Sequence, residues 1–125
     1  MTSTVLLAVG SAIPILWGIA HIIPTRAVVA GFGELSPDNR RILTMEWVAE
    51  GLALVFLGVL PGLMLLTGAT SGAGLVVIRA VAVMLLAMAL WTRVTGARTP
   101  SVPMKLCPVV KVVAAACLLA GSIAA

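Results

Sequence analysis

The sequence predicts an all-α integral membrane protein, a bundle of four membrane-spanning helices. Apolar residues make up 62% of the 125 residues and charged residues only 10%, whereas about a quarter of the residues of a soluble domain are charged. The mean hydropathy is +1.22. The apolar residues fall into four long stretches, and a span needs only about 20 residues. We therefore expect residues 1–125 to form one multi-pass domain in the cell membrane.

The first span is predicted over residues 5–23, ending before Pro24. No basic residue precedes it and no small-residue cleavage site follows, so we interpret it as a retained helix rather than a removable signal peptide. The segment from Thr25, which contains Gly31 and Gly33, is expected to form a short interfacial loop.

The second helix is predicted to begin at the sequence SPDN, residues 36–39. Serine can cap the free N–H groups of a helix, proline is tolerated at the first helical position, and aspartate complements the positive end of the helix dipole. This helix is expected to cross the membrane over residues 43–66.

The remaining chain supplies two further spans. An uncharged turn of small residues, 67–74, precedes the third span, 75–91. A basic loop with two prolines follows over residues 92–106, and the fourth span covers residues 107–124.

The basic residues predict the orientation. Seven of the eight Lys and Arg residues border the loops after the first and third spans: Arg26, Arg40, Arg41, Arg93, Arg98, Lys105 and the neighbouring Lys111. Short cytoplasmic loops are enriched in these residues, so both termini are expected on the external side. Arg79 lies within the third span and is expected to reach outward.

Topology brings the unusual polar residues to one depth, in the inner half of the bundle. His21 follows Trp17 by four residues near the inner end of the first helix, and Glu50 follows Glu46 by four near the inner end of the second. Residues four apart share one helix face. We expect Glu50 to face the bundle interior, within reach of the first or third helix, and Glu46 to lie nearer water. The candidate catalytic residues are Glu50, His21 and Glu46, and the candidate substrate-binding residues are Trp17, Trp47, Trp91 and Arg93.

Three functions fit these residues. An ionised acid deep in the bilayer costs roughly 2 to 3 kcal/mol or more, and His21, the only histidine, can take and give a proton near neutral pH. In an enzyme, Glu50 or His21 would protonate an alkene or epoxide of a lipophilic molecule while the other removes a proton or positions water, giving isomerisation, cyclisation or epoxide opening. The alternatives are a structural or accessory subunit, in which Glu50 is a satisfied polar contact, and a proton-linked transporter.

Other functions and partners are limited by the same residues. One histidine and two glutamates make a poor metal set, so neither a metal nor another cofactor is expected. The pI near 10.1 reflects basic residues beside apolar segments, which suit lipid head groups rather than nucleic acid. Cys107 and Cys117 are interpreted as packing residues. Gly58 and Gly62 predict tight packing within the monomer, with a homo-oligomer seam as the alternative.

In size, four-span layout and basic inner loops the chain resembles the small DoxX-like bacterial membrane proteins. The combination of His21, Glu46, Glu50 and tryptophan is also similar in residue types to the emopamil-binding sterol isomerases, and this similarity implies movement of a double bond by protonation and deprotonation. Small multidrug transporters share the length, the span number and an intramembrane glutamate. Their acid lies in the first helix, however, and the first helix here has none.

Overall fold

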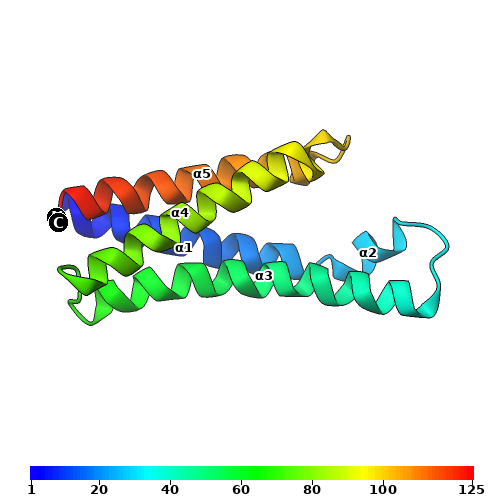
Figure 1. Ribbon diagram of the computed structural model, residues 1–125, viewed down its shortest axis with the longest axis horizontal. Helices are drawn as coiled ribbons and strands as arrows, with labels where there is room; N and C mark the ends of the chain where they lie inside the picture. Colours follow the sequence, from blue (N-terminus) through cyan, green and yellow to red (C-terminus); the bar gives the residue numbers. More distant parts are fainter.

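The computed structural model describes all 125 residues, and its regular secondary structure is entirely helical (Figure 1). The elements are α1 (Thr2–Ile22), α2 (Thr25–Ala30), α3 (Pro37–Leu66), α4 (Ala73–Val94), the 3-10 helix η1 (Gly96–Arg98) and α5 (Val102–Ile123). The four long helices α1, α3, α4 and α5 are each long and apolar enough to cross a membrane. The prediction of an all-α four-helix bundle is therefore confirmed.

The helices are packed unevenly. α1 lies along both α3 and α5, and α4 lies along α5, whereas α3 and α4 contact each other over a shorter stretch. Figure 1 shows the cause: α4 leaves the end of α3 at the short turn between them and then diverges from it. The bundle is closed at the turn and splayed at the opposite end.

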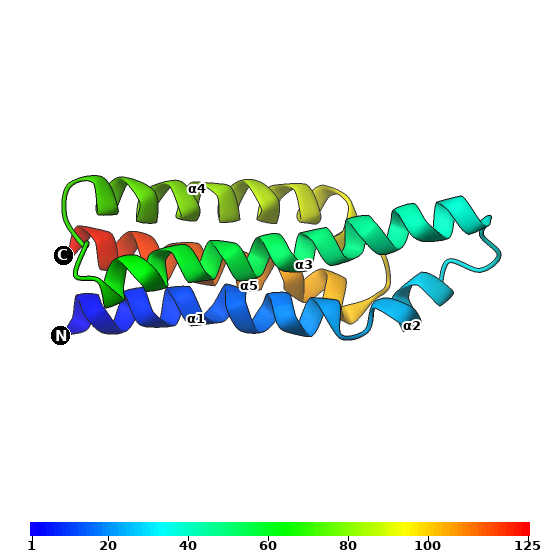
Figure 2. The ribbon, with the colours of Figure 1, turned by 90° about the horizontal axis from the view of Figure 1, so that it is seen from below.

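Both chain termini lie at one end of the bundle (Figure 2). The other end, which we call the basic end, holds the connections α1–α3 and α4–α5. The cations at or near these connections are Arg26, Arg40, Arg41, Arg93, Arg98 and Lys105. The side of the membrane that the basic end faces stays a prediction.

The start of α3 agrees with the prediction. The Ser36 hydroxyl accepts a hydrogen bond from the Asn39 N–H at 3.2 Å, Pro37 opens the helix, and Asp38 lies in its first turn. The helix then continues without a break to Leu66, the predicted end.

Two predicted loops are partly helical instead. The stretch TRAVVA, which contains neither glycine nor proline, forms the six-residue helix α2, which begins directly after Pro24 and ends at Ala30, before Gly31. The helix α5 begins at Val102, five residues before the predicted start of the fourth span. From the sequence, Pro103 is expected in the loop, but a proline in the first turn of a helix removes no helical hydrogen bond.

Glycine permits the close approach of α1 and α3. A Cβ atom on Gly18 would lie 2.6 Å from the Gly51 carbonyl oxygen, and one on Gly58 would lie 2.5 Å from the Ser11 carbonyl oxygen. Real Cβ atoms do not come so near, so only glycine fits at either position. Gly58 therefore packs within the monomer, as the sequence predicted. Gly62 has more room, because the nearest atom to its Cβ would be 3.7 Å away.

The apolar core occupies the half of the bundle near the termini and its centre. Its fully buried members include Leu7, Leu54, Ile78, Leu85 and Leu118, with Ala114 and Ala115 on α5. Many large apolar side chains point outward from all four long helices, as expected where the solvent is lipid. The polar interior lies in the other half, toward the basic end.

Candidate functional site

An ion pair between α3 and α5 forms the centre of the candidate site. The Lys111 ammonium group donates to the Glu50 carboxylate, with 2.8 Å between Nζ and Oε1, and also to the Thr92 hydroxyl of α4 at 2.9 Å. The Lys111 side chain is only 1% exposed, whereas that of Glu50 is 36% exposed. The Lys111 side chain is thus fully buried in the bundle, whereas part of the Glu50 side chain remains exposed.

His21, the last buried residue of α1, lies next to this ion pair. Its Nε2 atom is 3.8 Å from the second Glu50 oxygen, Oε2. The same Nε2 atom is buried and has no hydrogen-bond partner in the protein. His21, Glu50, Thr92 and Lys111 together are called the polar cluster below.

Trp47 holds the histidine in place. The two rings are stacked, with centroids 3.9 Å apart and planes inclined by 13°. The Trp47 indole N–H donates to the His21 carbonyl oxygen at 2.7 Å. This carbonyl lies in the last turn of α1, where the helix supplies no N–H group to pair with it. Trp47 therefore provides the missing hydrogen-bond donor and also orients the His21 ring by stacking on it.

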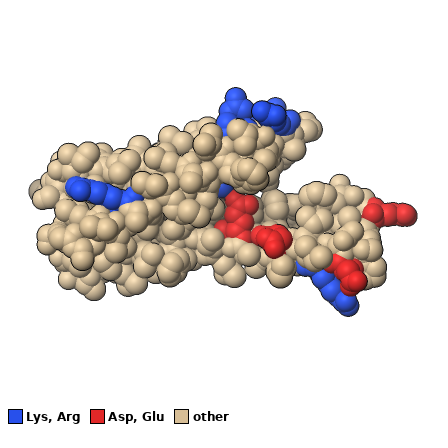
Figure 3. Space-filling view, viewed as in Figure 1, with Lys and Arg blue, Asp and Glu red and all other residues tan.

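A cavity of about 690 Å³ opens beside the polar cluster. It lies where α3 and α4 diverge, and residues of α1 and α5 close it from behind. Ten of its 17 lining residues are hydrophobic, among them Met84, Met88 and Met104. Figure 3 shows the corresponding hollow between the part of the molecule formed by α4 and α5 and the part formed by α3, with acidic side chains at its inner end. The size and lining suit a small, mostly apolar ligand.

Five of the seven predicted site residues line this cavity: Glu50, His21, Glu46, Trp47 and Trp91. Glu50 faces the interior within reach of α1, as predicted, and Glu46 is exposed at the cavity edge. Trp91 also lies at the edge and is 71% exposed.

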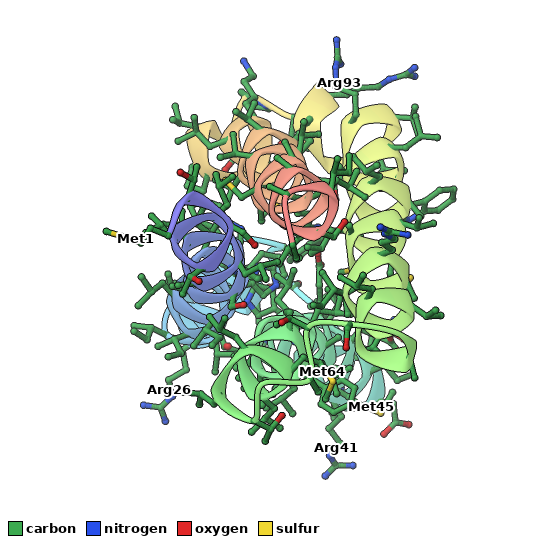
Figure 4. The ribbon with its side chains drawn as sticks, turned by 90° about the vertical axis from the view of Figure 1, so that its left-hand side faces the viewer. Met1, Arg26, Arg41, Met45, Met64 and Arg93 are labelled. Atoms are coloured by element: carbon green, nitrogen blue, oxygen red, sulfur yellow. The ribbon has the colours of Figure 1, made fainter.

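Trp17 and Arg93 lie elsewhere. Trp17 packs against the core, and its indole N–H donates to the Cys107 sulfur at 3.4 Å, so it stands behind the cavity wall. Arg93 points away from the bundle (Figure 4) and lines a separate groove between α4 and α5. Arg93, a predicted substrate-binding residue, therefore does not join the other candidates at the cavity, because it is on another face of α4.

The sequence interpretation missed Lys111 and Thr92. Lys111 was counted with the basic loop, yet it is the only charged residue after Lys105, well inside the fourth apolar stretch. An ionisable group within a span needs an interior partner, and this rule singles out Lys111 as it does Glu50. Thr92 carries no comparable signal.

The other cation within a span, Arg79, is not a partner of Glu50. Its guanidinium group donates to the Ser122 hydroxyl and to the Ser122 carbonyl oxygen, both at 3.2 Å, near the termini. Both cysteines are free, Cys107 buried and Cys117 half-buried. No group of three His, Cys, Asp or Glu side chains is arranged to hold a metal ion.

No family model, curated protein or solved structure matches this chain. The resemblance to DoxX-like proteins stays a prediction. The four apolar helices and their packing place the chain in the class of small four-span membrane proteins.

Proposed function

We propose that the protein binds a lipophilic small molecule in the cavity between α3 and α4 and exchanges protons with it through the polar cluster. This proposal rests on His21, a residue that lines the cavity and whose Nε2 atom is buried without a hydrogen-bond partner. Buried polar atoms are rarely left unpaired, since each costs roughly 1 to 3 kcal/mol. A polar group on a bound molecule would satisfy it.

The cavity favours a lipophilic partner over a water-soluble one. Its walls are mostly apolar, and its edge lies between two helices whose outer faces carry large apolar residues. A molecule dissolved in the bilayer could enter between α3 and α4 without crossing water. Glu46 and Trp91, both exposed at the edge, would be the first side chains that it meets.

The polar cluster supplies the groups for a double-bond shift. One member of the pair His21 and Glu50 delivers a proton to one end of an alkene, and the other removes a proton from the carbon next to the other end. The product differs only in the position of the double bond. The proton then returns from one side chain to the other, across the 3.8 Å between His21 Nε2 and Glu50 Oε2, and the protein regains its starting state. Lys111 would hold Glu50 in position and balance its charge.

A second candidate is a purely structural role for the same residues. Lys111 is 1% exposed and has two acceptors, Glu50 and Thr92, which belong to two different helices. The same hydrogen bonds could serve only to hold α3, α4 and α5 together, as expected in an accessory membrane subunit. That role leaves the buried His21 Nε2 atom without a hydrogen-bond partner, since the nearby Glu50 oxygen is 3.8 Å away.

The test is mass spectrometry of small molecules that co-purify with the protein. We would compare the parent with His21→Phe, which keeps an aromatic ring for Trp47 but removes the nitrogen, and with Glu34→Gln, which removes a carboxylate outside the four long helices. We expect a lipophilic molecule enriched in the parent and in Glu34→Gln, and at least about tenfold depleted in His21→Phe, as loss of a hydrogen bond to a charged or buried group implies. Equal retention by all three proteins would contradict the proposal.

A further inference from the structure

A second hollow lies on another face of the molecule, between α4 and α5 at the basic end. This groove has a volume of about 500 Å³. Its walls are apolar, formed by Leu86, Ala89, Leu90, Pro108, Val109, Val112 and Val113. Arg93 and Lys105 complete the lining, one from each helix. The groove therefore combines an apolar trough with two cations.

These two cations are not compensated by the protein. Neither forms an ion pair, and all four acidic residues of the chain precede residue 51, whereas α4, η1 and α5 carry none. Both side chains are exposed. Figure 3 shows basic side chains gathered at this end of the α4–α5 pair without acidic neighbours. Figure 4 shows Arg93 directed away from the bundle.

We propose that this groove binds an anionic phospholipid. One acyl chain lies in the trough, and the phosphate group sits between Arg93 and Lys105. Basic pockets between membrane helices suit anionic head groups, and arginine forms paired hydrogen bonds with phosphate oxygens. The same bilayer that surrounds the protein supplies the ligand, so no other partner is needed to neutralise the two charges.

The shape of the groove distinguishes this site from the general lipid-facing surface. Ala89 and Pro108 are buried and form its floor, and the valines along α5 are short enough to leave the trough open. Leu86 and Leu90 form the wall on α4. A chain lying there contacts protein on more than one side, whereas a chain on a convex helix surface contacts it on one.

The experiment is a native mass spectrometry titration of the purified full chain in an uncharged detergent. The probes are phosphatidylglycerol and phosphatidylcholine with identical acyl chains. The test variant is Arg93→Gln with Lys105→Gln. Its matched control is Arg26→Gln with Arg40→Gln, which removes the same charge from the same end but from α2 and α3, outside the groove.

We expect the parent to retain phosphatidylglycerol in preference to phosphatidylcholine. The test variant should bind phosphatidylglycerol more weakly by about fivefold for each cation removed, while the control stays within about twofold of the parent. A third variant, Val112→Trp, fills the trough and keeps the charge, and it should also weaken binding. Equal losses in the test variant and its control, or equal retention of the two lipids by the parent, would overturn the proposal. Because the groove is separate from the polar cluster, this outcome is independent of the proposed function.

Discussion

Lys111 and Glu50 are the residues whose roles depend most on each other. A lysine that is 1% exposed within an apolar bundle requires a counter-charge, and Glu50 supplies it at 2.8 Å. Removal of one partner leaves the other charge unpaired, whereas removal of both leaves no charge at all. The pair is therefore expected to show strong energetic coupling.

We predict that Lys111→Met destabilises the protein by about 3 kcal/mol. This is the lower end of the usual range for a broken buried pair, because Glu50 retains partial exposure. The double variant with Glu50→Gln should recover at least half of that loss, since no ion then remains in the interior. Unfolding by denaturing detergent, followed by circular dichroism, measures both. Additive losses in the double variant would show that the two residues do not stabilise each other.

Glu50 also separates the two candidate functions. Once the co-purified molecule and its conversion by the protein are known, Glu50→Gln should retain binding of that molecule, because the amide preserves shape and hydrogen bonding. Turnover should fall by about 100-fold or more, as for the loss of a general acid or base. Steady-state kinetics beside a binding measurement gives both numbers. Unchanged turnover would leave the structural role as the one that fits.

At the level of the helices, glycine allows α1 and α3 to come close. Gly18 and Gly58 lie against backbone atoms of the facing helix, so α1 and α3 touch through their main chains. Side chains at these positions would push the helices apart. In lipid, where helices are held together mainly by close packing, such contacts contribute directly to stability.

We predict opposite effects for two neighbouring glycines of α3. In Gly58→Ala the new methyl group would meet the Ser11 carbonyl oxygen at 2.5 Å, and the required shift should cost about 1 to 3 kcal/mol. In Gly62→Ala the nearest atom is 3.7 Å away, so the better helix propensity of alanine should leave stability unchanged or raise it by up to about 1 kcal/mol. Thermal unfolding of both variants in one detergent compares them. A loss for Gly62→Ala as large as that for Gly58→Ala would contradict this account of the α1–α3 contact.

At the scale of the whole molecule, the charges lie asymmetrically along the bundle. With Lys111 buried in the interior, six of the eight Lys and Arg residues remain at the basic end, and Arg79 is near the termini. The excess of Lys and Arg at the basic end, which predicts that this end is cytoplasmic, thus remains even when Lys111 is not counted.

We predict that cysteines introduced at position 2 and at position 97 react from opposite sides of the membrane. The label should reach position 2 from outside, because the termini are expected to be external. Both native cysteines would first be replaced by alanine. Labelling of both positions by an impermeant reagent added outside would disprove the predicted topology.

The amino-acid sequence alone was sufficient for the helices, since their signals are local. Apolar stretches marked the spans, and SPDN marked the start of α3. The sequence also identified Glu50 and His21 as unusual, because an ionisable residue in an apolar stretch is costly wherever the helix packs. The segment of residues 25–30 and the start of α5 were predicted less well. A stretch of six residues is too short to indicate a helix clearly, and a proline such as Pro103 fits both a loop and the first turn of a helix.

The partners of these residues depended on packing in three dimensions. Whether Lys111 belonged to the basic loop or to the interior was decided by the rotation of α5, which turns its side chain toward Glu50 and Thr92. The rotation of α4 places Trp91 at the cavity and Arg93, two residues later, in the groove on the other side. Two positions along a helix correspond to about 200° of rotation, so residues that share a depth in the membrane can face opposite surroundings. The depth of a residue follows from its position in the chain, whereas the rotation of its helix is decided by packing against the neighbouring helices.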